Sequence, residues 1–162
     1  MRYIIRFANE NDLSGLCSIR NNRALFIHYL KKFMNKEIYL LIAEQNSIIL
    51  GFGLLKIKGT LHPKLSDLYV KEEYRGNGIG SDLIRCRENI ARNLGYTEIY
   101  VSVDPIENPK MVKLIKKHSY ETISEPYIKK AIFYDSDGSS YDKTYQRIDL
   151  KKLLNYRWAV VL

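Results

Sequence analysis

The fold of this chain is decided by residues 65–80, which read LSDLYVKEEYRGNGIG. The apolar run Leu65–Val70 predicts a strand, and a helix follows because apolar residues recur at spacings of three and four from Ile79 to Leu94. Gly95 stands where that helix would stop. A strand that turns directly into a helix leaves unpaired backbone N–H groups at the turn, with the positive end of the helix dipole behind them. The stretch therefore predicts a binding site for an anion.

Three glycines shape this turn. Gly76, Gly78 and Gly80 remove the Cβ atoms that would hold a pyrophosphate away from the backbone amides, and Arg75 adds a charged donor. The spacing does not fit the dinucleotide fingerprint, whose glycines fall at positions one, three and six. It does not fit a Walker loop either, because no lysine follows Gly80. The alternative is that the glycines do no more than form a tight loop into a helix.

This arrangement resembles the GNAT superfamily of N-acetyltransferases. The signature of that family is Gln or Arg, two residues, Gly, one residue, then Gly or Ala, and it is matched by Arg75, Gly78 and Gly80. The motif resemblance runs from about Leu65 to Tyr120, and the order of expected elements extends it over the whole domain. It implies an enzyme that moves an acetyl (acyl) group from acetyl-CoA to a primary amine, without a metal.

The remaining segments fit one domain of this kind, because 162 residues that are 46% hydrophobic are enough for one core. The resemblance implies the α/β (α+β) class, with a central mixed, largely antiparallel sheet of about six to seven strands, about four flanking helices, and splayed fourth and fifth strands. We expect the domain at residues 1–150 and a C-terminal tail at 151–162. The patterns predict strands at 3–7, 38–43, 48–57, 65–70, 99–103, 127–134 and 141–150, helices at about 13–20, 25–34, 79–94 and 108–117, and bulges at Gly51 and Gly53.

The resemblance also implies how coenzyme A would be held. The turn amides would bind its pyrophosphate, the main chain of the fourth strand would pair with its pantetheine arm, and an asparagine at the head of the next helix would contact it. The expected cofactor-binding residues are Leu68, Tyr69, Val70, Arg75, Gly76, Asn77, Gly78, Ile79, Gly80, Ser81 and Asn108.

Direct attack of the amine on the thioester needs a polarised carbonyl and a base. We expect the backbone N–H of Val70 to polarise the carbonyl and Asp67 to act as the base. Strand alternation places Asp67 on the opposite face from its neighbours, so a solvated or salt-bridged carboxylate is the alternative. Glu72 and Glu73 are expected to be surface charges.

The leaving thiolate needs an acid, which in many relatives is a tyrosine seven residues after the asparagine. That position is Ile115 here, so the usual donor is missing. We expect Tyr120 to replace it, with Tyr127 and Tyr134 as other candidates, although with 13 tyrosines in the chain most must be packing residues.

The positions of the cysteines and histidines argue against a zinc site and against a Ser-His-Asp triad. The two cysteines, Cys17 and Cys86, have no Cys or His neighbour at metal-ligand spacing, and we expect buried thiols. His28, His62 and His118 are scattered through the sequence. Neither a zinc site nor a Ser-His-Asp triad is predicted.

The net charge of +8 attracts phosphates of any source. Basic residues alternate with acidic ones in most segments, and no DNA-binding motif accompanies them, so we expect no nucleic-acid partner. No stretch approaches the roughly 20 apolar residues of a membrane span, and no signal peptide is predicted. We expect a cytoplasmic protein without a membrane partner.

The acceptor amine cannot be identified from the sequence, although we favour a small molecule over a protein. An acidic pocket would suit polyamines or aminoglycosides, and specificity is expected from residues 25–34 and 134–141. A homodimer is also considered. Two other functions stay open: a catalytically weak protein that binds acyl-CoA as a regulatory ligand, and a basic nucleic-acid-binding module.

Overall fold

The computed structural model describes residues 1–155 of the chain as eight strands, four α-helices and two short 3-10 turns, Glu10–Asp12 and Glu72–Tyr74. The strands are β1 (Ile4–Phe7), β2 (Ile38–Gln45), β3 (Ile48–Lys56), β4 (Lys64–Val70), β5 (Glu98–Val103), β6 (Glu121–Thr122), β7 (Tyr127–Tyr134) and β8 (Ser140–Leu153). The helices are α1 (Leu13–Ile19), α2 (Arg23–Met34), α3 (Ile79–Asn93) and α4 (Pro109–Lys117).

The strands form one mixed sheet in the order β1-β2-β3-β4-β5-β8-β6, and β7 pairs with β8 outside this path. Every pairing is antiparallel except the one between β4 and β5. The predicted fold class, largely antiparallel sheet and four helices are confirmed. The sequence patterns missed β6, because two residues are too short to show an alternation.

The predicted splay of the fourth and fifth strands is confirmed. β4 and β5 pair only at Lys64 with Tyr100 and at Leu65 with Val101, near the start of each strand. Beyond these positions the two parallel strands diverge, so the β4 edge that faces β5 has no strand beside it. This divergence is the opening around which the functional site is built.

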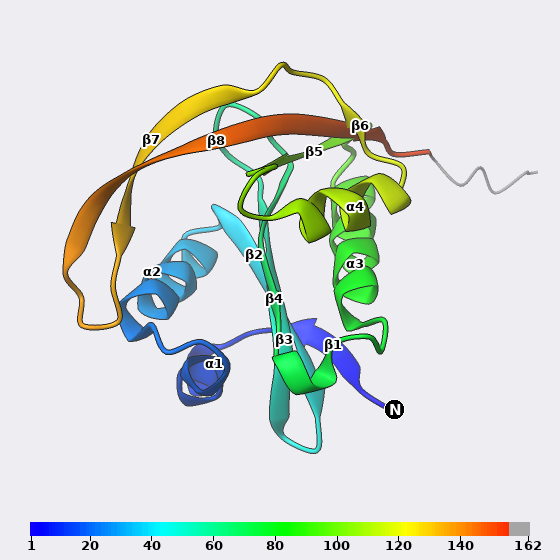
Figure 1. Ribbon diagram of the computed structural model, residues 1–162. Helices are drawn as coiled ribbons and strands as arrows, with labels where there is room; N and C mark the ends of the chain where they lie inside the picture. Colours follow the sequence, from blue (N-terminus) through cyan, green and yellow to red (C-terminus); the bar gives the residue numbers. More distant parts are fainter. Residues whose placement is uncertain (156–162) are drawn as a thin grey trace, which may run out of the picture.

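Helices α1 and α2 cover one face of the sheet, and α3 and α4 cover the other (Figure 1). The central strand β3 is therefore buried on both faces, and its residues 49–55 are all buried, which explains why it reads as an unbroken apolar run. Phe26 of α2 packs against Phe52 of β3 on one side, and Leu83 and Ile84 of α3 are fully buried on the other. These contacts fix both helix pairs against the middle of the sheet.

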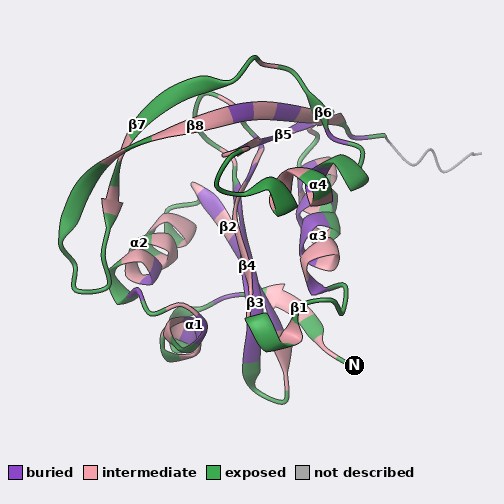
Figure 2. Ribbon diagram, in the orientation of Figure 1, coloured by how far each residue is buried: buried purple, intermediate pink, exposed green. Residues whose placement is uncertain are grey.

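The long hairpin of β7 and β8 curves away from this core and passes over to the α2 side of the molecule (Figure 1). Most of β7 is exposed, whereas the end of β8 beside β5 is buried (Figure 2). Near the hairpin turn, the Asn22 side-chain amide donates to the backbone carbonyl of Tyr134 at 3.0 Å. The hairpin thus extends from the α3–α4 side of the sheet to the α2 side and covers the opening between β4 and β5.

The last strand extends past residue 150, the boundary predicted from the sequence between the domain and the C-terminal tail. β8 continues to Leu153, three residues past the expected boundary, and Leu154 is buried with its N–H donating to the Thr97 carbonyl at 2.8 Å. Residues 151–153 therefore belong to β8, and Leu154 is bonded to the residue before β5. Trp158 lies outside the described residues. Within residues 1–155, no helix has the length and apolar character that crossing a membrane requires.

Candidate functional site

The glycine turn begins α3 with backbone geometry suited to an anion. Gly76 and Gly78 have φ of +81° and +83°, a region that side-chain-bearing residues rarely adopt. Gly78 is the N-cap, and no side chain of the described residues caps the helix there. Asp82 donates its N–H to the Gly78 carbonyl, but the preceding amides at 79–81 have no intrahelical acceptor. Three N–H groups at the positive end of a 15-residue helix therefore face the turn.

Arg75 connects this turn to the end of β4. Its Nε donates to the Val70 carbonyl at 2.8 Å, and its guanidinium carbon lies 5.3 Å from the centroid of the Tyr69 ring. The Asn77 amide donates to the Tyr74 carbonyl at 3.0 Å and holds the turn in shape. The guanidinium stays exposed, with its two Nη atoms available to a phosphate.

On the edge of β4 that diverges from β5, every second residue directs its backbone N–H group toward the opening. The N–H of Lys71 donates to the Leu50 carbonyl of β3 at 2.8 Å, so by strand alternation the N–H of Tyr69 also faces β3. The N–H groups of Leu68 and Val70 then face the opening left by β5. Of the three strand residues expected to pair with the pantetheine arm, these two are suitably oriented.

A β-bulge interrupts β4 at Asp67. Leu68 is opposite Gly53 of β3 and Ser66 is opposite Leu54, so Asp67 has no partner on that strand. Its φ of +31° lies outside ordinary strand geometry. A bulge redirects the side chain of the extra residue, and Asp67 accordingly lines the cavity together with its two neighbours. The bulge that Gly53 predicted is therefore present.

Two residues hold the Asp67 carboxylate from the side of the sheet that α1 and α2 cover: Arg20, which follows α1, and Tyr29 of α2. Arg20 donates from Nη1 to Oδ2 at 2.9 Å, and the Tyr29 hydroxyl donates to the same oxygen at 2.8 Å. Burial, and then the charge and hydrogen bond of Asp67, raise the pKa of Tyr29 well above its ordinary value. Asp67 is thus fixed in place by two donors, and Tyr29 stays protonated as one of them.

The backbone beside the bulge is held by a buried arginine of α3. Arg87, only 1% exposed, donates to the carbonyls of Leu83, Leu54 and Ser66 at 3.0, 2.8 and 3.1 Å. A Cβ at Gly53 would lie 2.9 Å from its guanidinium carbon, so the missing side chain makes room for it. Burial lowers the pKa of Arg87 to about 10, which keeps it charged at neutral pH. Helix α3 therefore joins the glycine turn to the bulge.

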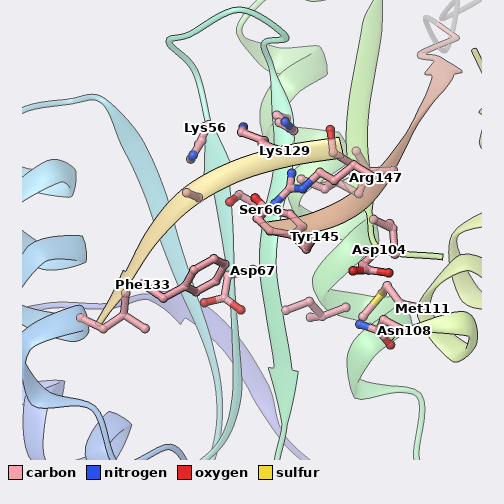
Figure 3. Close-up of a pocket in the computed structure, with 18 of the residues that line it drawn as sticks. Lys56, Ser66, Asp67, Asp104, Asn108, Met111, Lys129, Phe133, Tyr145 and Arg147 are labelled. Carbon is pink, nitrogen blue, oxygen red and sulfur yellow. The ribbon is translucent and has the colours of Figure 1, made fainter. Parts of the chain in front are cut away.

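These elements surround a cavity of about 1010 Å³ (Figure 3). Met111 of α4 and Asn108, which precedes this helix, line one side, and Phe133 and Tyr145 of the hairpin line the other. Asn108 is the N-cap of α4, yet its side chain makes no capping bond and lines the cavity instead. Its amide is thus positioned across the opening from β4, where a cofactor contact was expected.

The two predicted catalytic residues lie in different environments. Asp67 lines the cavity, whereas Tyr120 is 2% exposed and donates its hydroxyl hydrogen to Glu88 at 2.7 Å, within the core. Glu88 also pairs with Lys152 at 3.0 Å. Burial and the Glu88 charge raise the pKa of Tyr120 far above its ordinary value. Ile115, at the position of the missing tyrosine, does line the cavity.

Several site residues were not found from the sequence. Arg20, Tyr29 and Arg87 act on the bulge from elements that are distant in sequence, and no local pattern marks them. Tyr145 brings a phenol into the cavity from β8. The register of β7 against β8 would have indicated this orientation, because Tyr145 is opposite Lys129, another lining residue.

Comparisons with known proteins agree with this geometry, although a search of curated proteins gave no match. The model of the acetyltransferase (GNAT) family matches residues 4–120. An N-acetyltransferase from Staphylococcus aureus Mu50 has a TM-score of 0.72 at 18% identity, covering 96% of this chain and 100% of that one. PaiA N-acetyltransferase from Thermoplasma acidophilum, in complex with coenzyme A, has a TM-score of 0.72 at 18% identity over 94% and 99%.

A third solved structure, a putative acetyltransferase from Salmonella typhimurium with its cofactor acetyl-CoA, has a TM-score of 0.70 at 14% identity. It covers 96% of this chain and 95% of that one. The structural neighbours share the fold, and the family model covers most of the chain. The chain belongs to the GNAT family of acetyltransferases.

Proposed function

We propose that this protein is an N-acetyltransferase that moves the acetyl group of acetyl-CoA to the primary amine of a small molecule by direct attack. The observation that carries the proposal is the divergence of β4 from β5 after Leu65, with an uncapped helix N-terminus at one end and Asp67 in the same cavity. The family and fold support acetyl-CoA as the donor.

The described residues fit coenzyme A along a continuous path. The amides of residues 79–81, with Arg75 beside them, would hold the pyrophosphate, because the left-handed glycines keep side chains away from that position. The N–H groups of Leu68 and Val70 would pair with the pantetheine arm as an added strand does, and the Asn108 amide would contact it from α4. The cofactor supplies the acetyl thioester.

Asp67 would attract the protonated amine and take its proton through water, since Arg20 and Tyr29 hold the carboxylate at the cavity surface. The N–H of Leu68 or Val70 would donate to the thioester carbonyl. The structure favours Tyr145 over Tyr120 as the proton donor to the thiolate, because it is the one of the two that lines the cavity.

The test has two readouts. Calorimetric titration with acetyl-CoA and with desulfo-coenzyme A measures cofactor binding, and release of free thiol in the presence of an amine panel measures transfer. We expect both ligands to bind and at least one amine to be acetylated. If neither ligand produces heat or a thermal shift, the proposal is wrong at its first step.

A second candidate function is a regulatory protein that binds acyl-CoA with little or no turnover. The observation that favours it is the absence of a tyrosine hydroxyl at Ile115, together with the burial of Tyr120 away from the cavity. Binding of acetyl-CoA without thiol release for any amine would support this function. A gain of turnover in Ile115→Tyr would instead show that an acid was the only missing part. A cytoplasmic location and a homodimer stay predictions from the sequence.

A further inference from the structure

One end of the cavity carries a cluster of four cations from four different strands. Lys56 of β3 and Lys64 of β4 are register partners, and with Lys129 of β7 and Arg147 of β8 they line the cavity. In Figure 3, Lys56, Lys129 and Arg147 all lie above Ser66. These four residues are called the basic cluster below.

The basic cluster follows from the register of the hairpin. Lys129 is opposite Tyr145, and Arg147 is opposite Tyr127, two positions along the same two strands. Side chains two residues apart lie on one face, so Lys129 and Arg147 both face the cavity. Lys130, the next residue along β7, faces the other way and does not line it.

No carboxylate within residues 1–155 forms an ion pair with any member of the basic cluster, whereas Lys143 beside it pairs with Glu107 at 3.0 Å. Asp149 is the one carboxylate named among the charges that act on Lys64, with the smallest effect of those charges, and it already accepts hydrogen bonds from the hydroxyls of Ser102 and Tyr127. The cluster is therefore a concentration of unbalanced positive charge.

The cations of the cluster also act on one another. Partial burial, followed by repulsion from Arg147 and its neighbours, lowers the pKa of Lys64 to about 8. Partial burial and nearby cations lower the pKa of Lys56 as well. A bound anion would relieve this repulsion, so this end of the cavity favours an anionic ligand.

The phosphates of coenzyme A do not account for this charge. The glycine turn follows the end of β4, whereas Lys64 is its first residue, so about 20 Å of strand separates the two sites. The basic cluster instead lies between the hairpin, which carries Lys129 and Arg147, and the start of β4, on the far side of the bulge from the turn. It therefore belongs to the acceptor half of the cavity.

An aromatic wall lies between the basic cluster and Asp67. The Arg147 guanidinium carbon lies 5.1 Å from the centroid of the Tyr145 ring, which meets Phe133 edge-on at 5.6 Å. Phe133 lies beside Asp67 in Figure 3. A molecule along this wall would have one end at a carboxylate and the other end at cations.

We propose that the acceptor is an amine that also carries an anionic group, a carboxylate or a phosphate, held by Lys64, Lys129 and Arg147 while the amine lies at Asp67. This inference rests on the proposed function and names its substrate class. Arginine suits both anions because its planar fork can donate two parallel hydrogen bonds. The expectation that polyamines or aminoglycosides would fit an acidic pocket is not supported, because the cavity end is basic.

The experiment compares acceptors that differ only in the anionic group. We would measure kcat/KM for 5-aminopentanoate against pentylamine, and for 2-aminoethyl phosphate against ethanolamine, with spermidine as a polycation. We expect at least one anionic member to exceed its uncharged partner about 10-fold or more, and the pair that shows the preference identifies carboxylate or phosphate. Equal rates within both pairs, or a preference for spermidine, would overturn the proposal.

Matched variants test which residues are responsible. Lys129→Met and Arg147→Gln should each lower the preference for the anionic amine, as the ratio of its kcat/KM to that of its uncharged partner, about 10-fold and leave the acetyl-CoA affinity unchanged. Lys130→Met removes the same charge from the other face of β7 and should have no effect. A loss in Lys130→Met as large as that in Lys129→Met would contradict a local site.

A binding readout separates this proposal from the proposed function. With coenzyme A saturating the glycine turn, inorganic phosphate or malonate should raise the melting temperature more than chloride at equal ionic strength, and Lys129→Met should abolish the difference. If no amine is acetylated but this shift appears, transferase activity is wrong and the anion site stands. If amines are acetylated without the shift or the acceptor preference, the anion site is wrong and the transferase stands.

Discussion

The two halves of the cavity are built from different parts of the polypeptide. The half proposed to bind the cofactor, called the cofactor half, consists largely of backbone N–H groups from one continuous segment, residues 68–81, with Asn108 facing it. The acceptor half consists of side chains from α2, β3, β4, β7 and β8. A backbone site depends on glycines and strand direction, whereas a side-chain site can change its preference with each substitution. Under the proposed function, the same scaffold would keep one donor while its acceptor changes by substitution.

The largest effect on binding is expected from a substitution in the cofactor half. Gly78→Val should weaken acetyl-CoA binding by at least about 100-fold, because a branched side chain would occupy the space of the pyrophosphate. The control is Gly138→Val in the hairpin turn, where φ is +87° and a Cβ is equally unobstructed. Calorimetry on both variants separates backbone strain from lost binding. Equal affinity in Gly78→Val and the wild type would show that the pyrophosphate lies elsewhere.

The next effect concerns the side chain at the junction of the two halves. Asp67→Asn keeps the shape of the group but removes its charge, so turnover should fall about 100-fold while the acetyl-CoA dissociation constant stays constant. Glu72→Gln, an exposed carboxylate near the turn, serves as the control. If Asp67→Asn retains full turnover, Asp67 has only a structural role with Arg20.

A smaller effect is expected for the proton donor. Tyr145→Phe should lower turnover about 10-fold, with little change in stability, because Tyr145 lines the cavity and the substitution removes only its hydroxyl. Tyr120→Phe should leave turnover unchanged. It should lower the free energy of unfolding by about 1–2 kcal/mol, because Glu88 loses a buried hydrogen-bond donor. Steady-state kinetics and chemical denaturation of both variants would decide. A turnover loss confined to Tyr120→Phe would restore that residue as the acid.

The smallest effect is a pH dependence of stability in the basic cluster. The pKa of Lys64 is lowered to about 8 from 10.5, so between these values the unfolded chain binds the proton that the folded chain has lost. Its contribution to stability therefore rises with pH in this window. Lys64→Met should be more stable than the wild type at pH 7, and this difference should shrink by about 1 kcal/mol at pH 9.5. Lys130→Met should show a constant difference in denaturation at both pH values.

The two halves also differ in how far the sequence predicts them. The turn at 75–80 and the family could be predicted because glycine spacing and hydrophobic periodicity are local signals, and the family resemblance then implied the splayed strands. The role of Asp67 depends on a bulge that reverses the alternation of β4, and only Gly53 on the facing strand indicated it. The basic cluster depends on the register of β7 against β8, which a turn between two strands does not specify uniquely.

The pairing of Gly53 with Arg87 has a consequence for the evolution of this chain. The guanidinium fills the volume that a Cβ would take, and three hydrogen bonds prevent it from moving aside. Replacing the glycine first would create a steric clash, and replacing the arginine first would leave carbonyls unsatisfied and a void beside the bulge. Either substitution alone is expected to destabilise the protein, whereas both substitutions together need not do so. Positions 53 and 87 are therefore expected to covary among descendants of this sequence, with few lineages crossing between the two combinations.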